Sequence, residues 1–344
     1  MSEVLIRKAG RAGRITLNRP EALNALNYAM CREIDAALRA WARDPAVELV
    51  VMDAAGPRAF CAGGDIAELY ARGTAGDHAF GQGFWRDEYR MNDRIAAYPK
   101  PVVSLMQGFT MGGGVGLGCH ASHRIVGETS QIAMPECGIG LVPDVGGTHL
   151  LARAPGRLGL WLGLTGSRMG PGDALLAGFA DHFVPEADWP LMLSELEAGR
   201  IAIPRHEAPI GRLAELRPEI DRLFAGPDLR ASVARLRDAG TPLAEETLKA
   251  LGRGSPLALA ATAEILTRLG TDGSIRDALR LEYLFTFRAQ AHADFLEGIR
   301  AAIIDKDRKP RWRHQDIDSV PESEVAALLA PLGADGLTFG EEGI

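Results

Sequence analysis

The chain has 344 residues, enough for roughly two domains and for a core that needs neither disulfides nor a structural metal. Its formal net charge of −7 argues against nucleic acid as the main partner, and no apolar run is long enough to predict a membrane span. The four cysteines lie far apart without a C-x-x-C pattern, so we expect reduced thiols and a cytoplasmic protein.

The predicted elements of the first half alternate between strands, glycine-rich loops and helices. Asn27 is placed to cap a helix that continues to about Ala42, with Met30, Ile34, Leu38 and Trp41 on one face. The other elements predicted here are a charged helix over 83–98 and strands over 4–8, 14–18, 48–53, 102–106, 124–126 and 131–134. This alternation is typical of an α/β fold.

Strand patterns fade after about residue 186, and helical patterns follow. We therefore predict a core over residues 1–185, a mostly helical region over 186–333 and a flexible tail over 334–344. In the helical region, Ser255 is placed to cap a helix that Gly270 closes. Residues 274–304 form a long helical stretch, and we expect a break near Gly298.

Two glycine-rich loops, over 60–65 and 112–116, each follow a predicted strand. Glycine lets backbone N–H groups approach a ligand closely, and two such groups from different loops form an oxyanion hole. The simpler interpretation is that the glycines only permit tight turns between strand and helix. A dinucleotide site is disfavoured, because no G-x-G-x-x-G follows a first strand.

The loop over 135–147 carries two carboxylates, Glu136 and Asp144, among apolar residues, glycines and prolines. An unpaired carboxylate is costly in such surroundings unless it has a partner or a function. Two neighbouring carboxylates push their pKa values apart, which divides acid from base or nucleophile. The alternative is that each carboxylate caps a helix or bonds its own loop.

Four stretches resemble, in order and spacing, the crotonase (enoyl-CoA hydratase/isomerase) superfamily over about residues 3–185: Asn18–Leu26, Phe60–Asp65, Met111–Gly116 and Pro135–Gly147. The resemblance implies an α/β fold built as a spiral of ββα units, with a helical C-terminal region after it. It also implies acyl-CoA substrates, whose thioester oxygen binds in an oxyanion hole made by the N–H groups of Gly64 and Gly113.

A second set of stretches resembles one branch of that superfamily, the 3-hydroxyisobutyryl-CoA hydrolases, and extends the match to about residues 3–320: Met111–Leu117, Ala133–Gly147, Leu164–Gly166, Asp294–Ala301, Ile304–Asp307 and Pro310–Trp312. The branch implies hydrolysis of 3-hydroxyisobutyryl-CoA to CoA and 3-hydroxyisobutyrate in valine catabolism. Glu136 and Asp144 match its acidic catalytic pair, and Glu88 matches a substrate-binding position. The other interpretation of Glu88 is a solvated helix charge.

The chain departs from the enoyl-CoA hydratases at one catalytic position. Those enzymes use two glutamates to manage one water, and the first of these positions is Gly116 in this sequence. The second is kept as Glu136, and Asp144 stands where hydratases typically carry glycine. The ordinary hydration mechanism is therefore unexpected. Two routes stay open for hydrolysis: nucleophilic attack by Glu136, or general-base catalysis on water by Glu136 or Asp144. Three other roles of Asp144 also stay open: binding the substrate 3-hydroxyl, positioning water, and protonating the leaving thiolate.

Other functions and partners follow from the same residues. The alternatives are a hydratase or isomerase acting on a related short-chain CoA ester, and a non-catalytic scaffold that binds CoA or RNA. Cys61, Cys137, His120 and His123 are weaker catalytic candidates, and no metal site is expected. We expect no resident cofactor, since CoA is part of the substrate, and no nucleic-acid or membrane partner. A homo-oligomer is compatible with the sequence.

Overall fold

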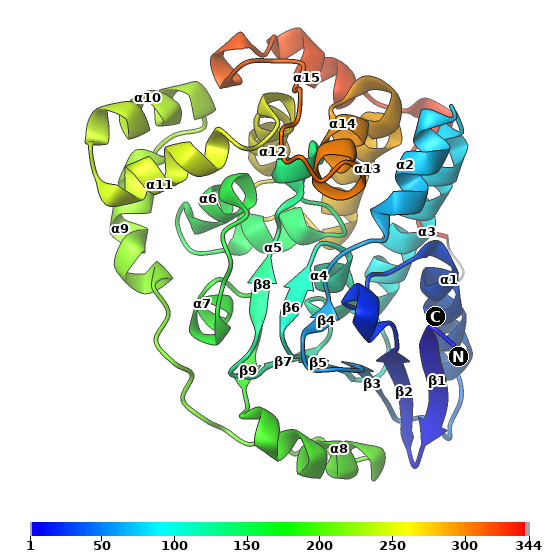
Figure 1. The fold of residues 1–344 in the computed structure, drawn as a ribbon. Coiled ribbons are helices and arrows are strands. Elements are labelled where there is room, and N and C mark those ends of the chain that lie inside the picture. The colour runs from blue at the N-terminus through cyan, green and yellow to red at the C-terminus, as the bar shows by residue number, and fades with distance from the viewer. Residues whose placement is uncertain (1, 341–344) are drawn as a thin grey trace.

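Nine strands form two sheets in the computed structural model, which describes residues 2–340 (Figure 1). The larger sheet has the order β1-β2-β3-β5-β7-β9, and the smaller has the order β4-β6-β8. β1 and β2 are antiparallel, and the other neighbouring strands are parallel. The strands are β1 (Val4–Ala9), β2 (Ala12–Leu17), β3 (Leu49–Ala54), β4 (Ala59–Cys61), β5 (Val102–Met106), β6 (Phe109–Met111), β7 (His123–Val126), β8 (Gln131–Ala133) and β9 (His182–Phe183).

From β3 onward the chain repeatedly enters the larger sheet, then the smaller sheet, and then forms a helix. β3 and β4 lead to α2 (Ile66–Thr74) and α3 (His78–Ala96), and β5 and β6 lead to α4 (Gly113–Gly118). β7 and β8 lead through the short helix η2 (Glu136–Ile139) to α5 (Gly147–Arg153). This is the spiral of ββα units that the sequence resemblance predicted, and the α/β class is confirmed.

The remaining helices precede the spiral or follow it. α1 lies between β2 and β3, and α6 to α15 make up most of the second half of the chain. Their bounds are α1 (Tyr28–Ala42), α6 (Leu158–Thr165), α7 (Pro171–Leu176), α8 (Trp189–Glu197), α9 (Leu213–Leu223), α10 (Leu229–Ala239), α11 (Pro242–Leu251), α12 (Pro256–Leu269), α13 (Ile275–His292), α14 (Phe295–Ile299) and α15 (Glu322–Leu328).

Helix capping explains several boundaries. The Asn27 side chain accepts from the N–H of Met30, as predicted, and the apolar face of α1 is buried. Ser255 caps α12 in the same way, and Gly270 ends it. The charged helix predicted over 83–98 is real but starts earlier, at His78, because Asp77 accepts from the N–H of Phe80.

The helical stretch predicted over 274–304 is interrupted earlier than expected. α13 ends at His292, and α14 begins at Phe295. At the break, the buried Asp294 accepts from the Ser255 hydroxyl at 2.6 Å and from the N–H of Arg313 at 3.1 Å. Gly298 instead lies inside α14, where a Cβ would stand 2.1 Å from the carbonyl oxygen of Ile139. The glycine allows close helix packing and does not end the helix, so the expected position of the break was wrong.

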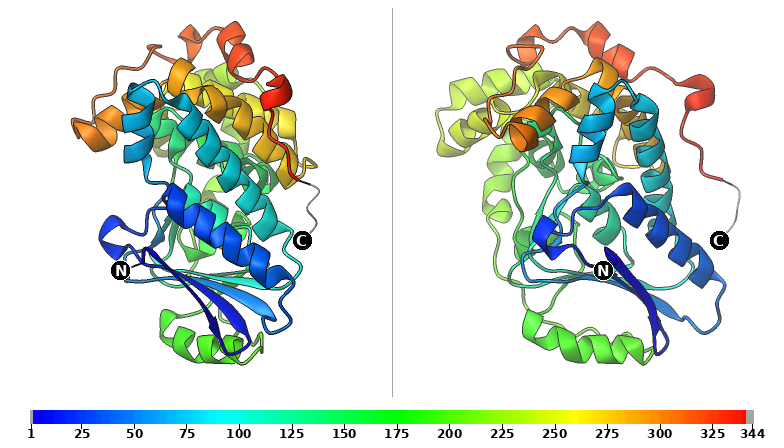
Figure 2. Two further views of the ribbon diagram at one scale, coloured as in Figure 1. Left: turned by 90° about the vertical axis from the view of Figure 1, so that its right-hand side faces the viewer. Right: turned by 45° about the vertical axis from the view of Figure 1, so that its right-hand side comes forward.

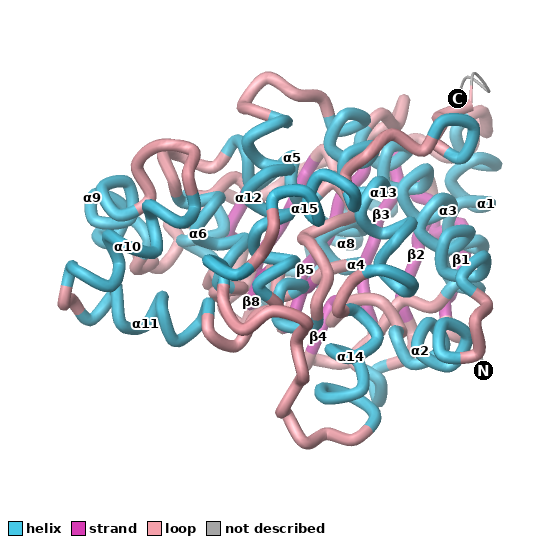
Figure 3. The backbone as a smooth tube through the Cα atoms, turned by 90° about the horizontal axis from the view of Figure 1, so that it is seen from above, coloured by secondary structure: helices cyan, strands magenta, loops and turns pink. Residues whose placement is uncertain are grey.

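The C-terminal helices pack on the spiral. α13 lies against α3, α12 packs against α5 and α6, and α14 lies beside α2 and η2 (Figures 1 and 3). One hydrophobic cluster contains residues from both parts, so the division at residue 185 stays a prediction. The tail predicted over 334–344 is described only as far as Gly340, where Thr338 accepts from Arg90 and Phe339 packs under Arg276.

The larger sheet is covered on both faces. Val50 and Met52 of β3 point into the main core, and Leu49 and Val51 point to the opposite side. Helix α8 covers that opposite side with Trp189, Met192 and Leu196 (Figure 2). A strand buried on both faces reads as a continuous apolar run, which explains the pattern of 48–53. Among the described residues, none of the helices has the length and apolar character needed to cross a membrane.

Two leucines of α8 provide a test of this packing. Leu196 is fully buried against the sheet, whereas Leu191 is 72% exposed. We expect Leu196→Ala to lower the free energy of unfolding by about 2–5 kcal/mol, because it leaves a cavity. Leu191→Ala carries the same change in helix propensity and should cost under about 0.5 kcal/mol. Urea denaturation followed by circular dichroism measures both, and equal losses would contradict the packing described.

Candidate active site

All five residues singled out from the sequence line one pocket of about 170 Å³. They come from the loop after β4 (Gly64), α3 (Glu88), the start of α4 (Gly113), η2 (Glu136) and the loop before α5 (Asp144). Apolar side chains complete the wall, among them Phe84, Trp85, Ile139, Leu141 and Phe295. No lysine or arginine lines the pocket within the part of the chain that the structure describes.

Two backbone amides at this pocket have no protein acceptor within residues 2–340. The N–H of Leu26 donates to the carbonyl of Gly63, and the carbonyl of Leu26 accepts from the N–H of Asp65. These two bonds flank Gly64, and its own N–H is left without an acceptor. Gly113 is the first residue of α4, so its N–H has no partner in the helix. The two loops meet here, because a Cβ at Gly113 would stand 3.4 Å from the nitrogen of Gly64.

The carboxyl group of Glu136 is buried and incompletely bonded. Its Oε2 atom has no hydrogen-bond partner among the described residues, and the residue is 5% exposed. A Cβ at Gly112 would stand 2.8 Å from the other oxygen, so the glycine leaves room for this side chain. Gly112 also has a φ of +48°, which favours glycine. Burial, and then the nearby Asp144 charge, raise the pKa of Glu136 well above its usual value.

Asp144 is held by a hydrogen bond from Tyr89, whose hydroxyl lies 2.9 Å from Oδ2. Burial raises the pKa of Asp144 to about 7, although this hydrogen bond lowers it. Burial and the Asp144 charge also raise the pKa of Glu88 well above the usual range. Glu88 is therefore a buried pocket residue and not a solvated helix charge.

A fourth carboxyl group supports the loop that carries Asp144. Glu282, on α13, accepts from the N–H groups of Gly146 and Thr148 at 2.8 and 3.0 Å, and from the Thr148 hydroxyl. Sequence reasoning missed both Glu282 and Tyr89. The available signal was their position: Leu279, Glu282, Tyr283 and Thr286 share one buried helix face, as do Trp85, Glu88 and Tyr89.

Gly116 has no room for a side chain. A Cβ there would stand 2.7 Å from Nδ2 of Asn92 and 2.8 Å from Cβ of Val145. Both contacts are closer than real Cβ atoms approach their neighbours, and both groups are buried. The position at which the hydratase pattern has a glutamate is thus filled by other parts of this chain.

The weaker candidates have ordinary structural roles. Burial raises the pKa of the Cys61 and Cys137 thiols to about 12, so both stay protonated. His120 lies within hydrogen-bond distance of the carbonyl of Val145, and burial lowers its pKa to about 4, which keeps the ring neutral. His123 stacks on His182 away from the pocket residues.

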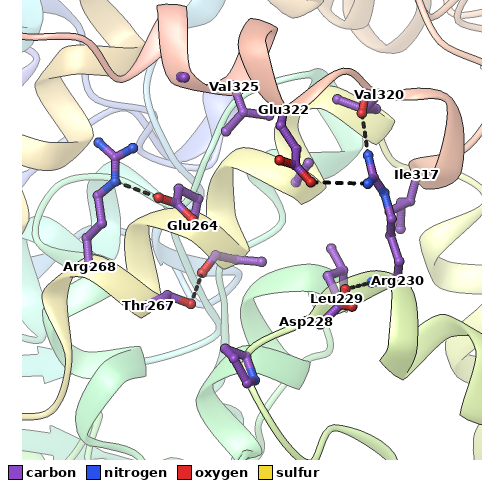
Figure 4. Close-up of a pocket in the computed structure, with 14 residues that line it drawn as sticks. Asp228, Leu229, Arg230, Glu264, Thr267, Arg268, Ile317, Val320, Glu322 and Val325 are labelled. Carbon is purple, nitrogen blue, oxygen red and sulfur yellow. Dashed lines mark hydrogen bonds and ion pairs between the residues drawn. The ribbon is translucent and has the colours of Figure 1, made fainter.

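A second cavity, of about 460 Å³, lies between α10, α12 and α15 (Figure 4). Its charged side chains are engaged with protein groups: Arg230 bonds Glu322 and the carbonyl of Val320, and Arg268 bonds Glu264. Asp228 caps α10. The cavity shares no lining residue with the acidic pocket and has no unpaired group poised for chemistry.

The ββα spiral, the two unused amides and the acidic pocket together define a crotonase-type enzyme. A model of the enoyl-CoA hydratase/isomerase family matches residues 12–329, and the chain belongs to that family. Its curated relatives include the mitochondrial 3-hydroxyisobutyryl-CoA hydrolases of Xenopus tropicalis and Homo sapiens. The first is 39% identical over 97% of this chain and 90% of its own length, and the second is 36% identical over 98% and 91%.

Two solved structures are similar over almost the whole chain. One, from Rhodobacter sphaeroides, is described as an enoyl-CoA hydratase and is 75% identical, with a TM-score of 0.97 and coverage of 98% of this chain and 100% of that one. The other, from Mycobacterium thermoresistibile, is described as a carnitinyl-CoA dehydratase. It is 41% identical, with a TM-score of 0.94 and coverage of 99% and 100%. The resemblance seen in the sequence, to the superfamily and to its hydrolase branch, is confirmed.

The buried carboxyls predict how stability depends on pH. Because the pKa of Asp144 is raised to about 7 in the folded protein, the native state keeps a proton that the unfolded state loses above about pH 4. This contribution to stability is therefore lost as the pH rises from about 4 through about 7. We expect the melting temperature to fall less between about pH 5 and about pH 8 in Asp144→Asn than in the wild type.

Differential scanning fluorimetry across that pH range checks this expectation. Asp238→Asn is the matched control, because it changes an exposed aspartate on α10. Its pH dependence should follow that of the wild type. If the melting temperatures of the wild type and Asp144→Asn change equally with pH, the pKa of Asp144 is not raised in the folded protein.

Proposed function

We propose that this protein hydrolyses the thioester of 3-hydroxyisobutyryl-CoA, giving free CoA and 3-hydroxyisobutyrate, in valine catabolism. The observation that carries the proposal is the pair Glu136 and Asp144, buried in one pocket beside the unused N–H groups of Gly64 and Gly113. The full-length similarity to curated 3-hydroxyisobutyryl-CoA hydrolases supports the same substrate. The acyl-CoA supplies its own CoA group, and we propose no resident cofactor.

In the proposed reaction, the thioester oxygen accepts hydrogen bonds from Gly64 and Gly113. Attack at the carbonyl carbon turns this oxygen into an oxyanion, and donors held in place stabilise it more than the ground state. The apolar wall of the pocket keeps bulk water away, so these hydrogen bonds act at low dielectric. Glu88, whose Oε1 lies 3.0 Å from where a Cβ of Gly113 would stand, is placed beside the bound acyl group.

The two carboxyl groups divide the proton transfers. Burial raises the pKa of Asp144 to about 7, and burial and then the Asp144 charge raise the pKa of Glu136 well above its usual value. We propose that Asp144 accepts a proton from the attacking water, and that Glu136 protonates the leaving thiolate as the carbon–sulfur bond breaks. Direct attack by Glu136 would need this carboxyl to ionise first, which its burial opposes.

A second candidate, hydration of an enoyl-CoA, is favoured by the description of the Rhodobacter sphaeroides structure. It would need a water held between two glutamates, one of them at position 116. The short contacts that surround Gly116 argue against that arrangement. The two functions are separated by their products, since only hydrolysis releases a free thiol.

Thiol release from 3-hydroxyisobutyryl-CoA, followed with a thiol reagent, tests the proposal. We expect the wild type to release CoA, and expect Glu136→Gln and Asp144→Asn each to lower kcat/KM by about 10²–10⁴-fold, because each removes an acid or base. Glu245→Gln, on the exposed surface of α11, is the control and should be as active as the wild type.

The same samples are tested with methacrylyl-CoA, whose loss of enoyl absorbance reports hydration. Loss of absorbance without thiol release from the saturated ester would overturn the proposed function in favour of the hydratase. If Glu136→Gln releases thiol as fast as the wild type, Glu136 is not the acid that protonates the leaving thiolate.

A further inference from the structure

Tyr89 lies directly behind the acidic pocket. It is fully buried on α3, next in sequence to Glu88, and is not itself a lining residue. Its hydroxyl lies 2.9 Å from Oδ2 of Asp144 and 3.3 Å from Oγ1 of Thr286. Its ring meets that of Tyr283 edge-on, with centroids 6.1 Å apart. The hydroxyl therefore has one fixed position, and that position is at the Asp144 carboxylate.

We propose that Tyr89 is a positioning residue, which holds Oδ2 of Asp144 in place and keeps this carboxylate in the form that accepts a proton from water. The inference rests on the proposed function, because it gives Tyr89 its role through Asp144. Tyr89 does not touch the substrate pocket, so its effect is exerted through the carboxylate alone.

The direction of the hydrogen bonds follows from a count of protons. Tyr89 has one hydroxyl proton, and an ionised carboxylate can only accept. The proton therefore goes to Asp144, whose Oδ2 lies 2.9 Å from the Tyr89 oxygen, and Oγ1 of Thr286 is the more distant neighbour at 3.3 Å. Thr286 belongs to α13, so the helical C-terminal region completes a chain of hydroxyls that ends at the pocket carboxylate.

The surroundings of Asp144 explain why such a donor is needed. The titratable groups facing it are Glu88 and Tyr89 from α3, Glu136 from η2 and Glu282 from α13, and the neutral His120, in the turn after α4, lies against the carbonyl of the neighbouring Val145. None of them is a cation. A neutral hydroxyl stabilises the ionised carboxylate without pairing it with a positive charge, which would make it a weaker base.

Tyr89→Phe removes the hydroxyl and keeps the ring. We expect kcat/KM at neutral pH to fall by about 10–100-fold, and the acid limb of its pH profile to move up by about one to two units. KM should change little, because Tyr89 does not line the pocket. Tyr283→Phe is the matched control: its hydroxyl donates to the carbonyl of Gln82 and contacts no carboxylate, so its profile should overlay that of the wild type.

A double-mutant cycle separates positioning from a general structural effect. In the Asp144→Asn background the hydroxyl has lost its ionised target, so adding Tyr89→Phe should change the rate less than about twofold. A full additional loss in the double variant would overturn the inference, as would a Tyr89→Phe profile identical to that of the wild type.

A measurement that needs no catalytic turnover tests the role of Tyr89 separately from the proposed function. The ¹³C carboxyl resonance of Asp144, assigned by its loss in Asp144→Asn, is titrated in the wild type and in Tyr89→Phe. A midpoint moved to higher pH in Tyr89→Phe supports the inference even if the wild type releases no thiol, a result that would refute only the proposed function. An unchanged midpoint refutes the inference even if thiol release is confirmed.

Discussion

Three carboxyl groups, those of Glu88, Glu136 and Asp144, line one buried pocket with no cation among the described residues that line it. Ionising all three at once would place like charges close together at low dielectric, so their protons are shared unequally. Burial raises the pKa of all three carboxyls: to about 7 for Asp144, on which the Tyr89 hydroxyl has a lowering effect, and well above the usual range for Glu88 and Glu136. The site is costly to build, and the surrounding structure must hold it in place.

The supports for this pocket come from parts of the chain that are far apart in sequence. Glu282 fixes the backbone on the C-terminal side of Asp144, and Phe295 forms part of the pocket wall. α14 packs on η2 so closely that a Cβ at Gly298 would stand 2.1 Å from the oxygen of Ile139, and one at Gly140 would stand 2.6 Å from the backbone of Asp294. The C-terminal helices therefore form part of the wall of this pocket and support the loop that carries Asp144.

Sequence reasoning reached the elements whose signals are local. Strands such as Val102–Met106, the Asn27 and Ser255 caps and the glycine-rich loops depend on neighbouring residues. The five candidate site residues, named from motif positions, line one pocket in the structure, and their roles stay a prediction. Tyr89 and Glu282 were missed because their partners lie 55 and 136 residues away. The break before α14 was misplaced for the same reason, since it depends on the distant Ser255 and not on the nearby Gly298.

The enoyl-CoA hydratase/isomerase family, to which the chain belongs, is named for one reaction, and curated relatives of the chain are named 3-hydroxyisobutyryl-CoA hydrolases; at one position the chain departs from the hydratase pattern. At Gly116 the space for a second catalytic glutamate is taken by Asn92 and Val145. Val145 adjoins Asp144, so the loop that excludes a side chain at 116 is also the loop that brings in a new carboxylate. In this chain, one loop therefore both fills space beside Gly116 and carries the Asp144 carboxylate into the pocket that Gly64 and Gly113 line.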